Sequence, residues 1–98
     1  MPSLYAVTRS HGVGWKHSLA LEQQSLWREH ADFMNALECE GFVLLGGPLE
    51  GTEEALLIVR AESVEEIGQR LAGDPWSESK QLVTTRVARW DLRLGTVG

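Results

Sequence analysis

The sequence has a single cysteine, Cys39, only three prolines, and no apolar run long enough to cross a membrane. A lone cysteine cannot form a disulfide within the chain, and it excludes a metal site built from several thiolates. The N-terminus lacks the basic start and apolar stretch of an export signal. These absences predict a cytoplasmic protein that has no membrane partner.

Positive charge is also scarce in this chain. Nine Lys and Arg residues stand against 14 Asp and Glu, so the formal net charge is −5. Non-specific nucleic-acid binding depends on a basic surface, and we therefore expect no nucleic-acid partner. The chain has 98 residues, of which 43% are hydrophobic. This length and composition predict one globular domain spanning residues 1–98.

The spacing of apolar residues predicts six elements in the order β-α-β-β-α-β. The strands are expected at residues 4–8, 42–45, 55–59 and 82–92, and the helices at residues 25–40 and 63–72. This order predicts an α+β, ferredoxin-like fold, in which an antiparallel sheet carries both helices on one face. A chain of this length has no third layer for the other face, so we expect a symmetric homodimer with sheets packed together.

Local signals mark where several of these elements begin or change. Ser25 is the expected N-cap of the first helix, and Ser63 with Glu66 has the capping-box spacing at the start of the second. In the last strand Val83, Thr85 and Val87 are expected on one face. The apolar parity changes after Val87, which predicts either a β-bulge or a strand end that leaves its own sheet.

His30 is the strongest candidate for a catalytic side chain. It lies within the apolar stripe of the first predicted helix, where a buried imidazole needs a hydrogen-bond partner. A backbone carbonyl would make it a core histidine, whereas a carboxylate would fix its tautomer for chemistry. Asp74, which Pro75 follows, is the best candidate for that carboxylate. An aspartate in this context also bonds nearby backbone amides in turns, and both readings stay open.

The segment at residues 9–24 has no clear periodicity and contains Gly12 and Gly14, so we expect a mobile or ligand-ordered lid. His11 and His17 lie in this segment, six residues apart. That spacing matches no dedicated zinc motif, so we expect both to be solvated and expect no metal and no cofactor.

Four segments in this order resemble the YCII-related domain family, whose members are similar in fold to muconolactone isomerase. They are residues 27–34, 41–49, 61–63 and 74–76. The resemblance implies a dimeric α+β barrel of ferredoxin-like subunits. It also implies an active site built on a histidine in the first helix and an aspartate before proline, here His30 and Asp74.

These observations favour a small cofactor-free enzyme of the lyase or isomerase type, which moves a proton on a small, partly apolar metabolite. His30 would be the general acid or base, and Asp74 would orient its ring. The residues expected to bind the substrate are Tyr5, Gly47, Pro48 and Trp76. The alternative is a non-catalytic module of the same fold that binds a small molecule or serves dimerisation, and the sequence does not separate the two.

Overall fold

The computed structural model describes residues 1–97. Its elements are, in order, β1 (Ser3–His11), the 3-10 helix η1 (Leu21–Gln23), α1 (Trp27–Cys39), β2 (Val43–Pro48), β3 (Glu54–Ala61), α2 (Val64–Ala72), α3 (Pro75–Glu78) and β4 (Leu82–Arg89). Apart from the short η1 and α3, this is the predicted β-α-β-β-α-β order. Within residues 1–97, no helix combines the length and apolar character needed to cross a membrane.

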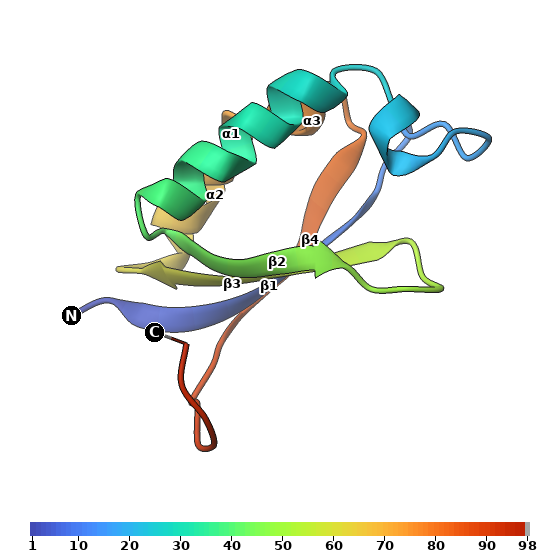
Figure 1. Ribbon diagram of the computed structural model, residues 1–98. Helices are drawn as coiled ribbons and strands as arrows, with labels where there is room; N and C mark the ends of the chain where they lie inside the picture. Colours follow the sequence, from blue (N-terminus) through green and yellow to red (C-terminus); the bar gives the residue numbers. More distant parts are fainter. Residues whose placement is uncertain (98) are drawn as a thin grey trace.

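The four strands form one sheet in the order β2-β3-β1-β4, with every neighbouring pair antiparallel. The helices all lie on one side of this sheet, and the C-terminal segment turns away on the other side (Figure 1). The predicted ferredoxin-like α+β fold is therefore confirmed.

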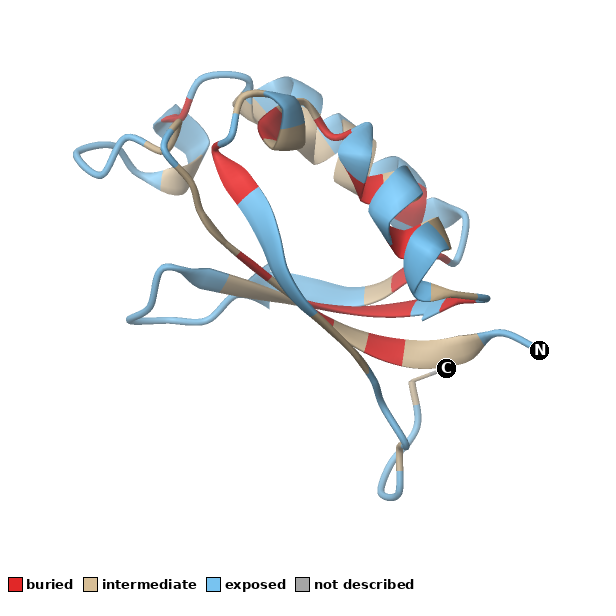
Figure 2. Ribbon diagram, turned by 180° about the vertical axis from the view of Figure 1, so that it is seen from behind, coloured by how far each residue is buried: buried red, intermediate tan, exposed pale blue. Residues whose placement is uncertain are grey.

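The core lies between the helices and the sheet, where the buried residues gather (Figure 2). Along β1 every second residue is buried, so Tyr5, Val7 and Arg9 all point toward the helices. Ile67 and Leu71 of α2 close the core from above the sheet. The side chains that alternate inward along β1 therefore face the apolar side of α2.

The first helix begins later than predicted, at Trp27, and its N-cap is Leu26 in the left-handed conformation (φ 66°) rather than Ser25. The reason is a tertiary contact. The Ser25 carbonyl accepts hydrogen bonds from Trp76 Nε1 (2.7 Å) and Gln81 Nε2 (2.8 Å), and these bonds hold Ser25 outside the helix.

At the start of α2, Ser63 is the N-cap as predicted, and its hydroxyl accepts from the Glu66 N–H at 3.1 Å. The Glu66 carboxylate, however, accepts from the N–H of Glu62 at 2.7 Å, one residue earlier than a capping box requires.

β4 contains a bulge, but it lies at Thr85 and not after Val87 as predicted, and the face predicted for Val83 is wrong. The register between β1 and β4 shifts between Thr8 and Arg9, which leaves Thr85 as the extra residue. Val87 therefore packs against the core, whereas Val83 lies on the opposite face and is 41% exposed. The strand ends at Arg89 instead of near residue 92.

Candidate active site

The structure brings His30 and Asp74 into contact. His30 lies in the first turns of α1, and Asp74 is the N-cap of α3. Nδ1 of His30 is 2.9 Å from both carboxylate oxygens of Asp74. The carboxylate is fully buried, while the imidazole keeps 12% of its surface exposed. The contact spans two segments that are far apart in the chain, and it leaves Nε2 as the ring nitrogen that Asp74 does not engage.

Asp74 is surrounded by hydrogen-bond donors. Besides His30, it accepts from Nη1 of Arg9 at 2.8 Å and from the backbone N–H of Trp76 at 3.0 Å. Burial alone would raise the pKa of Asp74, but the hydrogen bonds from His30, Arg9 and Trp76 outweigh it, and the pKa lies below its ordinary value. The side chain is therefore a carboxylate at neutral pH.

The ionised state of Asp74 determines the tautomer of His30. A carboxylate can only accept a hydrogen bond, so Nδ1 of His30 must carry the proton that is donated to it. In the neutral imidazole the other nitrogen, Nε2, then holds a free lone pair. This arrangement is suited to accepting a proton at Nε2.

Arg9 is a site residue that the sequence reasoning missed. Its guanidinium is 1% exposed, pairs with Asp74, and also donates from Nη2 to the Ser77 hydroxyl at 2.5 Å. Nε of Arg9 is buried and has no hydrogen-bond partner among the described residues. The signal was the period of two in β1, which places Arg9 in phase with Tyr5 and Val7. The predicted strand ended one residue too early to include it.

Two of the residues expected to bind substrate lie elsewhere. Trp76 is fully buried, and its ring stacks on the imidazole of His30 with centroids 3.9 Å apart and planes 8° apart. It supports His30 from behind and is not part of the cavity wall. Tyr5 belongs to the hydrophobic core: it lies four residues before Arg9 in β1, where it pairs with Val59 of β3.

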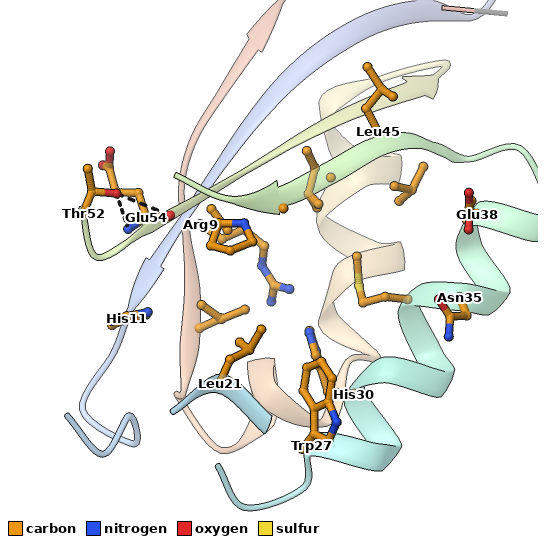
Figure 3. Close-up of a pocket in the computed structure, with 18 of the residues that line it drawn as sticks. Arg9, His11, Leu21, Trp27, His30, Asn35, Glu38, Leu45, Thr52 and Glu54 are labelled. Carbon is orange, nitrogen blue, oxygen red and sulfur yellow. Dashed lines mark hydrogen bonds between the residues drawn. The ribbon is translucent and has the colours of Figure 1, made fainter. Parts of the chain in front are cut away.

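A cavity of about 570 Å³ opens between α1 and the strands β1 and β2, a volume in the range of small-molecule sites. Gly47 and Pro48, two of the residues expected to bind substrate, line it, and so does His30. Figure 3 shows Arg9 and Trp27 pointing into the same space as His30. The walls are mostly apolar, and the polar residues among them include Asn35, Glu38, Thr52 and Glu54.

The loop after β1 is anchored at several points. Gly12 and Gly14 donate backbone hydrogen bonds to the carbonyls of Gln81 (3.1 Å) and Lys80 (2.9 Å). A side chain at Gly14 would place a Cβ 2.2 Å from the Ser79 carbonyl oxygen, so only glycine allows this approach. The two glycines are therefore packing positions, and Trp15 beyond them lines the cavity.

No protein-family model and no curated protein matches this chain. Among solved structures it is similar to 5-chloro-2-hydroxyhydroquinone dehydrochlorinase (TftG) from Burkholderia phenoliruptrix AC1100, determined in complex with 2,5-dihydroxybenzoquinone. The two share 23% sequence identity over 90% of this chain and 93% of the other, with a TM-score of 0.63. The likeness shows a shared fold. Membership of the YCII-related family stays a prediction.

Proposed function

We propose that this chain is a small cofactor-free enzyme of the lyase or isomerase type, which moves a proton on a small, partly apolar metabolite. The observation that carries the proposal is the environment of His30. A buried carboxylate holds Nδ1 at 2.9 Å, and the same imidazole lines a cavity of about 570 Å³. Such an imidazole can act as a general base and then as a general acid near neutral pH.

In the proposed reaction, Nε2 of His30 takes a proton from the substrate, and the resulting imidazolium is stabilised by Asp74. The imidazolium then returns the proton, either to another position of the substrate or to a leaving group. Asp74 keeps its own negative charge throughout and acts as a positioning residue. Proton transfer by a positioned side chain contributes about 10²- to 10⁴-fold in rate.

The position of Arg9 indicates that the substrate carries an oxygen atom. Removing a proton next to a carbonyl or a ring hydroxyl leaves negative charge on that oxygen. The Arg9 guanidinium lines the cavity, and its Nε–H has no partner among the described residues. A fixed N–H donor in a buried site stabilises developing negative charge. We therefore propose that the substrate carries an oxygen that becomes anionic beside Arg9.

The structural neighbour supports this substrate class in outline. It is named as a dehydrochlorinase and was determined with 2,5-dihydroxybenzoquinone, a small oxygenated ring. Loss of HCl from the chlorinated ring in that enzyme's name releases a proton and a chloride ion, and the proton needs an acceptor, which is the role proposed for His30. A ring of this size fits within a cavity of about 570 Å³.

The proposal is tested with two probes, 5-chloro-2-hydroxyhydroquinone as substrate and 2,5-dihydroxybenzoquinone as ligand. We expect the wild-type chain to release chloride from the first faster than buffer does, and to bind the second with a change in tryptophan fluorescence. Binding without chloride release would favour the alternative, a small-molecule-binding module. Neither binding nor release would contradict the proposed substrate class.

We also propose that the chain forms a homodimer through the side of the sheet opposite the helices, giving an α+β barrel. Val83 and Trp90 lie on that side and are 41% and 39% exposed. Covering such residues removes apolar surface from water. Sedimentation equilibrium at micromolar concentration should give the mass of a dimer.

Substitution on each side of the sheet sharpens this test. Val83→Asp should shift the population toward monomer, because the new charge would be buried in the interface. Val64→Asp is the matched control, since Val64 is similarly exposed but lies at the start of α2, on the helical side. A wild-type monomer, or equal effects of the two variants, would contradict the barrel.

A further inference from the structure

Three side chains that can bind a metal ion lie close together, on the side of the cavity opposite α1. They are His11 at the end of β1, His17 in the loop that follows, and Glu53 in the turn before β3. One atom from each lies within 4.8 Å of the other two. The expectation that both histidines are solvated rested on their spacing along the chain. The pairing of β1 with β3 brings in Glu53, whose carbonyl accepts from the His11 N–H at 3.0 Å.

The separations match those between ligands of one ion. Nδ1 of His17 is 3.4 Å from Oε1 of Glu53, and Nδ1 of His11 is 3.8 Å from the same oxygen. Zinc–ligand bonds of about 2.0–2.1 Å in a tetrahedron place neighbouring ligand atoms about 3.4 Å apart. The two distances to Glu53 are therefore close to those between the ligand atoms of a tetrahedral zinc ion, without any movement of the side chains.

His11 itself has an unmet requirement. Its Nδ1 is buried and has no hydrogen-bond partner in the part of the chain that the structure describes. A buried polar atom without a partner is unfavourable, and a metal ion would satisfy it.

Neighbouring contacts hold the two histidines in place. The ring of His11 stacks on Trp15 with centroids 3.8 Å apart and planes 8° apart. The buried side chain of Gln24 bonds both backbone groups of Lys16, accepting from its N–H at 3.1 Å and donating to its carbonyl at 2.7 Å. Lys16 is thereby fixed, which restricts the position of the next residue, His17.

We propose that His11, His17 and Glu53 form a binding site for a divalent transition-metal ion of the zinc class. Two imidazoles and one carboxylate are suitable ligands for such an ion, and three protein ligands leave one coordination position open. His11 also lines the cavity (Figure 3), so the site lies at the edge of the space that His30 faces. A bound ion joins the loop after β1 to the turn before β3. The proposal goes beyond the proposed function, because proton transfer at His30 requires no metal.

The test uses the full chain, stripped with EDTA and then titrated with ZnCl₂ by calorimetry and with CoCl₂ by visible absorption. We expect one ion per chain. His17→Ala and Glu53→Gln should each lower the affinity at least about 100-fold, since losing even a supporting contact to a ligand costs about 10- to 100-fold. His17 is 67% exposed, so its variant should keep the wild-type circular dichroism spectrum.

Two further variants act as controls. Glu50→Gln changes an exposed glutamate in the same turn, and His30→Gln changes the other histidine that faces the cavity; both should keep the wild-type affinity for zinc. No binding of zinc by the wild-type chain at micromolar concentration, or wild-type affinity in His17→Ala or in Glu53→Gln, overturns the proposal. Loss of binding in His30→Gln also overturns it, because the ion would then lie at the catalytic pair. Chloride release plays no part in these measurements, so they can fail independently of the proposed function.

Discussion

Asp74→Asn is expected to lower the free energy of unfolding by about 3–5 kcal/mol, the usual cost of breaking a buried ion pair by removing one partner. The Arg9 guanidinium is 1% exposed and pairs with the fully buried Asp74 at 2.8 Å. Both carboxylate oxygens accept hydrogen bonds, from Arg9 and from the Trp76 N–H. Asparagine offers a single acceptor oxygen and no charge, so the variant leaves a buried cation without its partner.

Urea denaturation of two further variants separates the ion pair from general damage. Arg9→Met with Asp74→Asn should cost less than the sum of the single changes, because removing both charges leaves none unpaired. Asp32→Asn should hardly change stability, since Asp32 pairs with Arg28 in an exposed position at 3.9 Å. Equal losses of unfolding free energy in Asp74→Asn and Asp32→Asn would show that the buried pair contributes no more to stability than an exposed one.

The same variant should alter the dependence of stability on pH. The pKa of Asp74 is lowered on folding from an ordinary value of 3.8. Its contribution to stability is therefore complete above about pH 4, the usual range for an unfolded aspartate, and is lost as the pH falls through the lowered value. The wild-type free energy of unfolding should fall in acid more steeply than that of Asp74→Asn. Parallel pH profiles for the two proteins would contradict this assignment.

His30→Gln is expected to lower kcat by about 10²- to 10⁴-fold while KM changes little. Glutamine is similar in length and can still reach Asp74, but it cannot carry a proton to and from a substrate near neutral pH. Chloride release under the conditions proposed above supplies both constants. Asp32→Asn, on the exposed side of the same helix, is the matched control and should keep the wild-type rate. A raised KM with unchanged kcat would mean that His30 binds and does not catalyse.

Local sequence patterns predicted the order of the elements. They also pointed to His30, as a histidine in an apolar stripe, and to Asp74, as an aspartate fixed by the following Pro75, and the resemblance to the YCII-related family implied the same pair. What they did not predict depends on tertiary pairing. Arg9 enters the site because β1 continues to His11, where it pairs with Leu82 of β4. Alternation places Arg9 in phase with Tyr5 and Val7, but the polar residues 9–11 interrupt the apolar pattern that marks the strand.

The same reason applies to Trp76 and to the three proposed metal ligands. The Asp74 side chain accepts from the Trp76 N–H and begins α3, a short helix that is absent from the predicted elements. That turn directs Trp76 inward beneath His30. Glu53 reaches His11 and His17 only through the alignment of β3 beside β1, which the spacing of the histidines along the chain cannot show.

The central claim is that ionised Asp74 holds the proton on Nδ1 of His30 and leaves a lone pair on Nε2. Nitrogen-15 NMR of the histidine rings at a pH where the imidazoles are neutral tests it most directly, with His30→Gln identifying the His30 signals. We predict that Nδ1 of His30 shows the shift of a protonated ring nitrogen and Nε2 that of an unprotonated one, the reverse of the tautomer preferred by free histidine. A His30 ring with the proton on Nε2, or with both nitrogens averaged, would contradict the claim.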